Sequence, residues 1–184
     1  MLVGLSVGGP FGWILSYAAS LPFFIGVFFF ALLGLIIGAV VFRVAAPGRP
    51  YGRGLVWIGT AMLVGGVWAV SIVKEANDFP LDMARRAAAQ SSDLGGKSLS
   101  QFKDGVAADV RHYVTKHYPP GGTIGYIRWV VVSGEVRRGS IESVNRTLNV
   151  PQRGAVWVIR SVLSLALLGF GIAAQTVPLS LPRR

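Results

Sequence analysis

The sequence predicts a mainly α-helical integral membrane protein, with three transmembrane helices and a small α or α+β domain between the second and third. Three stretches with almost no charge predict the spans, at about 21–43, 54–73 and 154–178. The stretch from Ser20 to Phe42 contains no Asp, Glu, Lys, Arg or His. As a helix it is about 35 Å long, enough to cross a bilayer core of about 30 Å. A helix that is apolar on every face suits lipid, because it satisfies its own backbone hydrogen bonds.

Composition divides the chain in the same way. Of 184 residues, 52% are hydrophobic and only 14% are charged, against about 25% charged in soluble domains. All eight acidic residues lie between Lys74 and Arg153. We therefore expect five segments: an apolar N-terminal segment at 1–19, a transmembrane hairpin at 20–73, a basic extramembrane domain at 74–153, a third span at 154–178 and a short basic tail at 179–184.

The N-terminal segment 1–19 differs from a secretory signal, because it lacks a basic n-region. Glycine and proline interrupt it at Gly8-Gly9-Pro10. An interfacial or re-entrant segment is the expectation, with a fourth span as the alternative.

Small residues recur on all three spans and predict close helix packing, because they let backbones approach one another. The connector 43–53 is short, so the first two spans must be antiparallel neighbours, and we expect their small-residue faces to meet each other. The helix-packing candidates are Gly26, Gly34 and Gly38 in the first span, Ala61, Gly65 and Ala69 in the second, and Gly169 and Ala173 in the third.

The extramembrane domain shows one clear helix. Apolar residues recur at helical spacing over 98–118, Ser98 and Gln101 form a capping box, and Pro119 ends the pattern. Residues 78–90 predict a separate short helix. Residues 124–132 suit a strand or, equally, a short helix lying on the membrane surface. Apolar residues at helical spacing continue over 140–149 and stop before Pro151.

Aromatic and basic residues give an orientation. Trp68 and Trp157 belong to the domain side of the membrane and Tyr51 and Trp57 to the other, as interfacial belts require. The connector and the C-terminal tail, which share one side, hold five basic residues in two short segments. Because positive charge favours the cytoplasmic side, we expect the connector and tail there and the domain opposite.

The sequence predicts no catalytic or metal site. The two histidines, His112 and His117, are five residues apart and so do not share a helix face as a zinc-binding pair does. Arg160 is the one ionisable residue well inside a span, and we expect it to extend to the interface. Arg160 and His117 are the remaining functional candidates. The absence of cysteine excludes disulfides and thiolate chemistry. No cofactor is predicted, although the Phe-rich face of the first span offers a surface for lipid or pigment.

The net charge of +10 is spread along the chain, with no basic run longer than a pair. This favours anionic lipid head groups or an acidic partner over nucleic acid. The expected function is that of a non-catalytic accessory subunit of a respiratory, photosynthetic or secretory assembly, packed against other membrane subunits through its small-residue faces. The first alternative is a free-standing membrane-anchored binding or sensor protein that uses residues 75–152. The second is a small membrane enzyme or transporter.

Overall fold

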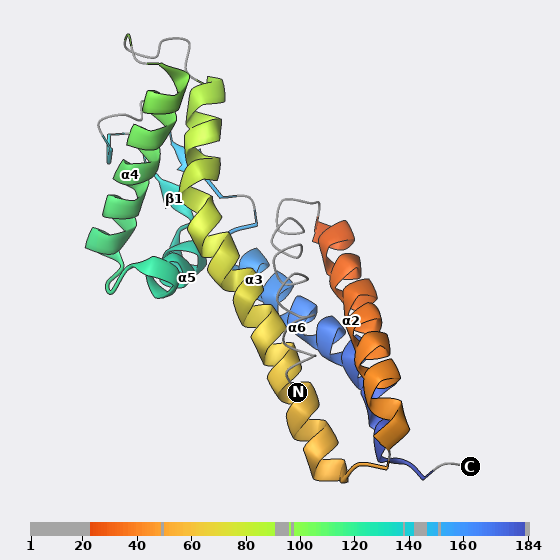
Figure 1. The fold of residues 1–184 in the computed structure, drawn as a ribbon. Coiled ribbons are helices and arrows are strands. Elements are labelled where there is room, and N and C mark those ends of the chain that lie inside the picture. The colour runs from red at the N-terminus through yellow and green to blue at the C-terminus, as the bar shows by residue number, and fades with distance from the viewer. Residues whose placement is uncertain are drawn as a thin grey trace. The chain divides into compact units, whose positions relative to one another are not determined.

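The structure is a computed structural model that describes residues 23–48, 50–90, 96, 98–137, 139–141, 147–150 and 152–182. Over these residues the chain is mostly helical (Figure 1). The elements are α2 (Phe23–Ala45), the 3-10 helix η1 (Ala46–Gly48), α3 (Arg53–Gln90), α4 (Leu99–His117), α5 (Gly122–Val132), β1 (Glu135–Val136), β2 (Leu148–Asn149), α6 (Ala155–Thr176) and the 3-10 helix η2 (Val177–Ser180). The expectation for residues 1–19 lies outside the described residues.

The chain forms two compact units. The first, called here the apolar unit, runs up to Ile72 and resumes at Ile159; the second, the polar unit, is Val73–Val158. The helices α3 and α6 each contribute to both units. Three helices of the described chain are long and apolar enough to cross a membrane: α2 with η1, α3, and α6 with η2. This confirms the three long apolar helices that the sequence predicts.

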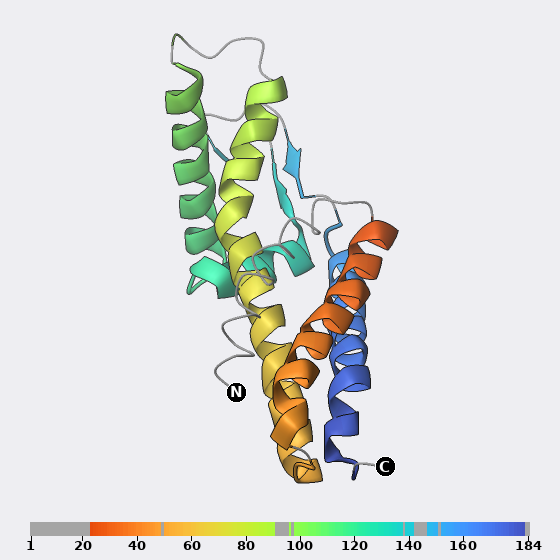
Figure 2. The same cartoon turned by 45° about the vertical axis from the view of Figure 1, so that its right-hand side comes forward.

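In the apolar unit α2, α3 and α6 lie side by side (Figures 1 and 2). Their facing side chains form one buried cluster: Phe30, Leu33, Ile37, Leu63, Val67, Leu168 and Ile172. A Cβ atom added to Gly34 would lie 2.6 Å from the Leu168 carbonyl oxygen, and one added to Gly171 would lie 2.7 Å from the Leu35 nitrogen. The backbones of α2 and α6 therefore cross at a distance that only glycine permits.

The expectation that the small faces of the first two spans meet each other is wrong. Gly34 and Gly38 face α6, where Leu168, Ile172 and Gln175 contact them. The corresponding residues of α3, which are Ala61, Gly65 and Ala69, are exposed. A short connector requires α2 and α3 to be neighbours but leaves the rotation of each helix about its own axis free, and this rotation decides which face meets which partner.

In the polar unit the predicted amphipathic helix is confirmed as α4. The Ser98 hydroxyl accepts from the Gln101 nitrogen at 3.3 Å, the Gln101 side chain accepts from the Ser98 nitrogen at 3.2 Å, and the helix ends two residues before Pro119. Its buried face packs with side chains from the other elements of the unit. The largest fully buried side chains here are Met83, Val106, Val110, Tyr126, Trp129, Val130, Val136 and Leu148.

The structure decides three local expectations in this unit. The separate helix at 78–90 is wrong, because α3 continues through Pro80 to Gln90. Residues 124–132, left open between strand and helix, belong to the helix α5. The helical expectation for 140–149 is wrong at its end, since Leu148 pairs with Val136 in an antiparallel two-stranded sheet.

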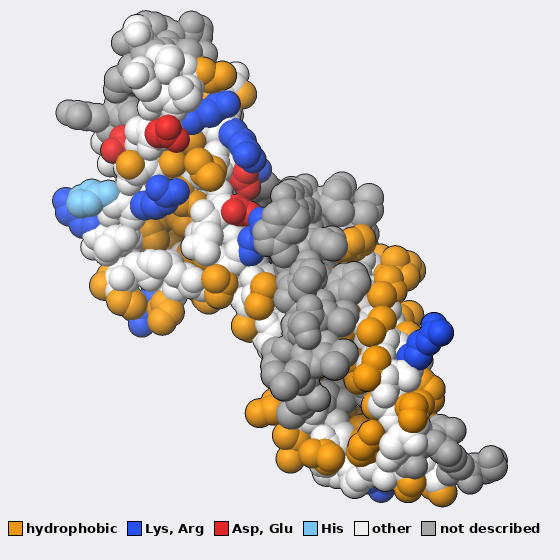
Figure 3. Space-filling model, in the orientation of Figure 1, with side chains coloured by type: hydrophobic (Ala, Val, Ile, Leu, Met, Phe, Trp, Pro, Cys, Tyr) orange, Lys and Arg blue, Asp and Glu red, His pale blue; other side chains and the backbone are white. Residues whose placement is uncertain are grey.

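The two units differ in their surfaces. Figure 3 shows hydrophobic side chains along α2 and the first part of α3, and Lys, Arg, Asp and Glu side chains over the polar unit. Exposed apolar side chains in the apolar unit include Phe28 (77%), Met62 (63%) and Phe170 (71%). Large apolar side chains exposed on three neighbouring helices suit contact with lipid or with other apolar helices.

Candidate functional site

Glu75 joins three elements of the polar unit. One of its carboxylate oxygens, Oε1, accepts a hydrogen bond from the Tyr126 hydroxyl at 2.7 Å and another from the Trp157 indole nitrogen at 3.0 Å. Glu75 belongs to α3, Tyr126 to α5 and Trp157 to the first turn of α6. We call these three residues the Glu75 cluster. Hydrogen bonds to a charged acceptor are stronger than neutral ones, so the cluster fixes the positions of three helices at one point.

An aromatic group surrounds the cluster. The ring of Phe79 lies 4.8 Å from that of Tyr126 and 5.1 Å from that of Trp129, measured between centroids. The Trp129 indole nitrogen donates to the Glu135 carbonyl oxygen at 3.1 Å. Trp129 and Tyr126 are almost completely buried, and each polar tip has a partner. Tyrosine and tryptophan with an apolar body and a hydrogen-bonded tip are the residues preferred at membrane interfaces.

A second polar network holds the small sheet to the start of α6. The Arg153 guanidinium donates to the Glu135 carboxylate at 2.6 Å and to the Asn149 side chain at 3.0 Å, and the Arg137 guanidinium donates to the Glu135 carboxylate at 3.1 Å. Hydrogen bonds from Arg137 and then Arg153 hold the pKa of the Glu135 carboxyl below its usual range. The Gly154 nitrogen also donates to the Val130 carbonyl at 2.8 Å. The residues that precede α6 are thereby fixed to α5 and β1.

The two histidines both belong to the amphipathic helix α4. His117 and His112 are exposed on α4. The His117 ring lies 4.6 Å from the Tyr113 ring. Burial, and secondarily the neighbouring Tyr118, raises the pKa of the Tyr113 hydroxyl. Among the described residues no group of three His, Asp or Glu side chains could hold a metal ion.

Arg160 belongs to α6, and the expectation that its side chain extends to the membrane interface stays a prediction. Arg160 is buried, with 7% of its surface exposed, and so are the neighbouring Ser161 and Ser164 of α6. The other candidates divide between packed and open positions. Gly26, Gly34 and Gly38 are buried, Gly169 packs on Val64 and Ala173 is half-buried, whereas Ala61, Gly65 and Ala69 are exposed.

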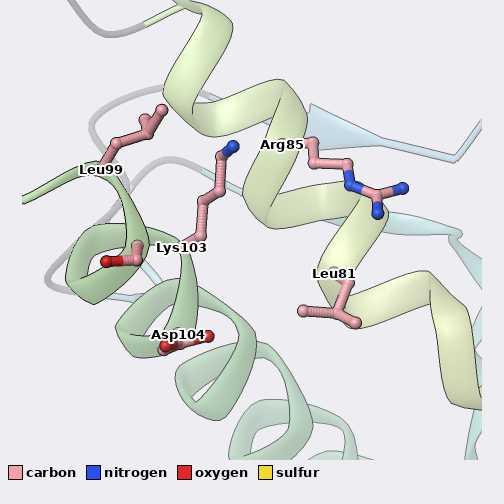
Figure 4. Close-up of a pocket in the computed structure, with 6 residues that line it drawn as sticks. Leu81, Arg85, Leu99, Lys103 and Asp104 are labelled. Atoms are coloured by element: carbon pink, nitrogen blue, oxygen red, sulfur yellow. The ribbon is translucent and has the colours of Figure 1, made fainter.

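A cavity of about 490 Å³ lies between α3 and α4 (Figure 4). Its lining comprises Leu81 and Arg85 of α3 and Leu99, Ser100, Lys103 and Asp104 of α4. Figure 4 shows Lys103 extending from α4 toward α3, whereas the Arg85 guanidinium points away from α4. Arg85 donates to Asp82 at 3.0 Å. The two cationic groups therefore do not converge on one position in the cavity.

Sequence reasoning missed two features of these sites. Glu75 and Lys74 are the first charged residues after the second span, which marks Glu75 as a border residue, but its partners Tyr126 and Trp157 are distant in sequence. Gly169 is the packing candidate that the sequence predicts, whereas Gly171, two residues further in the same Gly-Phe-Gly segment, makes the close contact with α2. No family model, curated protein or solved structure matches the chain.

Proposed function

We propose that this chain is an integral, multi-pass membrane protein that serves as a non-catalytic accessory subunit of a larger membrane assembly. In this proposal α2, α3 and α6 cross the bilayer, the connector 43–53 and the C-terminus face the cytoplasm, and the polar unit lies on the opposite side. The length and apolar character of the three helices support the membrane location. The partners are other membrane subunits and lipids, including anionic head groups.

The observation that carries the assembly role is the open small-residue face of α3. Ala61, Gly65 and Ala69 recur at four-residue spacing and are exposed, and no described residue lies within 4 Å of a Cβ built on Gly65. On α2, by contrast, the glycines at 34 and 38 are already covered by α6. Small-residue faces are where membrane helices approach each other closely. The face on α3 is therefore available to a helix of another subunit.

Enlarging this face tests the assembly role. We expect the double substitution Ala61→Leu and Ala69→Leu to reduce co-purification of other membrane proteins with the gently solubilised chain, and to move it to a lower mass on native gels. Ala39→Leu is the matched control, because Ala39 is an exposed alanine on α2 outside this face. A wild-type chain that migrates as a monodisperse monomer of its own mass contradicts the proposal.

A second candidate function is ligand binding by the polar unit, within residues 75–152. The cavity between α3 and α4 favours it, because its volume lies in the range of small-molecule sites. Native mass spectrometry of the full chain, released from mild detergent, should then detect a retained small molecule. Leu81→Trp should abolish the added mass by filling the cavity, whereas Leu55→Trp, at an exposed position of α3, should leave it unchanged. If the wild-type spectrum shows the bare chain, this candidate fails.

A further inference from the structure

The helix α5 has two apolar faces, and only one of them is covered. Its buried face carries Gly125, Tyr126, Trp129 and Val130. The opposite face presents Ile124 (54% exposed), Val131 (38%) and Val132 (74%). At 100° per residue these three side chains point to the same side of the helix. The outer face is therefore largely apolar and suits contact with a second apolar environment.

The position of α5 along the chain says what that environment is. Gly154, whose nitrogen donates to the Val130 carbonyl, directly precedes the apolar helix α6. Tyr126, which belongs to α5, donates a hydrogen bond to Glu75 of α3. Glu75 comes two residues after Val73, where the uncharged run of α3 ends. Both ties lie within the polar unit. α5 is therefore fixed at the points where the two apolar helices join the polar unit.

Exposed apolar side chains also occur in the polar unit outside α5. In the first turn of α6, within the polar unit, Val156 is 46% exposed and Val158 is 39% exposed. The outer face of α5 carries one charged residue, the exposed Arg128. One of its guanidinium nitrogens donates to the Pro119 carbonyl at 2.5 Å. An arginine of this kind can bury its stem in the interfacial layer while its head reaches a lipid phosphate.

From these observations we infer that α5 lies in the interfacial layer of the bilayer. Ile124, Val131 and Val132 contact the upper acyl chains, and Arg128 binds head-group phosphate. The inference rests on the proposed membrane location of α3 and α6 and adds a third point of contact, through which the polar unit sits on the lipid surface. A bilayer is favoured over a protein partner because the hydrogen bonds of α5 go to Glu75 and Gly154, near the ends of the proposed spans α3 and α6, where lipid is always present.

Spin labels can test this on the full chain, because the sequence contains no cysteine. Single variants Ile124→Cys and Val132→Cys are labelled with a nitroxide and reconstituted in lipid nanodiscs containing phosphatidylcholine and phosphatidylglycerol. Power saturation then compares collisions with oxygen, which concentrates in lipid, and with a water-soluble nickel chelate. His112→Cys on the exposed side of α4 is the aqueous control. Phe170→Cys, exposed in the middle of α6, is the control for lipid.

We expect the labels at 124 and 132 to favour oxygen over nickel several-fold, as the label at 170 does, and the label at 112 to show the reverse. If 124 and 132 behave like 112 while 170 reports lipid, the inference is overturned and the membrane proposal stands. If 170 also reports water, the membrane proposal fails with it. If 124 and 132 are shielded from both reagents, a protein covers this face and the lipid assignment is overturned.

Discussion

At the scale of single residues, Glu75 illustrates how few polar contacts can hold the polar unit together. One carboxylate oxygen receives the Tyr126 hydroxyl and the Trp157 indole N–H, and all three residues are at least half-buried. If a buried donor loses its acceptor, water does not fully replace the lost hydrogen bond, and the folded state becomes less stable.

The first prediction follows from this cluster. Glu75→Ala leaves two donors without their acceptor and should lower the free energy of unfolding by about 2–3 kcal/mol. Glu75→Gln keeps one oxygen acceptor and should cost less. Asp82→Ala is the control, because the exposed Arg85–Asp82 pair contributes about 0–1 kcal/mol. Thermal unfolding in mild detergent, followed by tryptophan fluorescence, measures all three. Equal losses for Glu75→Ala and Asp82→Ala would contradict the role given to the cluster.

The second prediction concerns pH and Glu135. Because hydrogen bonds from Arg137 and Arg153 lower the pKa of this carboxyl, its ionised form stabilises the fold at pH values above its ordinary pKa. That stabilisation is lost as the pH falls through the lowered pKa. The difference in melting temperature between wild type and Glu135→Gln should therefore be present at neutral pH and shrink on acidification. Arg153→Gln, which removes one of the two hydrogen bonds that lower the pKa of the Glu135 carboxyl, should reduce the pH dependence. A difference that stays constant with pH would count against this account.

At the scale of elements, the apolar unit depends on the close approach of α2 and α6. The approach needs Gly34 and Gly171 because a Cβ added to either residue would lie closer to the backbone of the other helix than real Cβ atoms do. Glycine in a helix interior costs about 0.5–1 kcal/mol relative to alanine. At these crossings the cost is offset by the packing that glycine permits, whereas Gly65, on the open face of α3, has no such compensation among the described residues.

The third prediction compares Gly34, at the crossing of α2 and α6, with Gly65, on the open face of α3. Gly34→Ala places a Cβ 2.6 Å from the Leu168 carbonyl oxygen and forces the two helices apart, which should cost about 1–3 kcal/mol. Gly65→Ala meets nothing within 4 Å and should be neutral or slightly stabilising. Unfolding of the detergent-solubilised chain by increasing dodecyl sulfate compares them. A larger loss for Gly65→Ala than for Gly34→Ala would show that the helices pack differently.

Local signals and distant contacts explain what the sequence could predict. The sequence predicts α4 because the signals for its two ends are local: the capping box begins at Ser98, directly before the helix, and Pro119 follows two residues after its end. The sequence predicts a separate short helix at 78–90, whereas α3 continues through Pro80 to Gln90. An interior proline costs a helix about 3 kcal/mol. At this point of α3 Phe79 packs on Tyr126 and Trp129, contacts that leave no local pattern in the sequence. The Glu75 cluster joins residues 51 and 82 positions apart, and neither pairing leaves a local pattern.

At the scale of the whole molecule, the proposed topology places the short connector and the polar unit on opposite sides of the bilayer, because one helix, α3, crosses it between them. Gly52 precedes α3 and Leu181 follows α6, so both lie at the ends of these helices away from the polar unit along the chain. His112 lies in α4, between the two crossings. If both helices span the bilayer, Gly52 and Leu181 share one side and His112 lies on the other.

The fourth prediction is therefore a labelling pattern. In sealed right-side-out vesicles a membrane-impermeant maleimide should label His112→Cys but neither Gly52→Cys nor Leu181→Cys, and inverted vesicles should give the reverse. Gly52 has no atom within 4 Å of an added Cβ, and Leu181 is 51% exposed, so both cysteines are accessible once the membrane is opened with detergent. Labelling of Gly52→Cys and Leu181→Cys from opposite sides would mean that one of the two helices does not cross. Labelling of all three from the same side would remove the membrane-spanning proposal itself, whereas an exchanged pattern would reverse only the orientation that the basic residues favour.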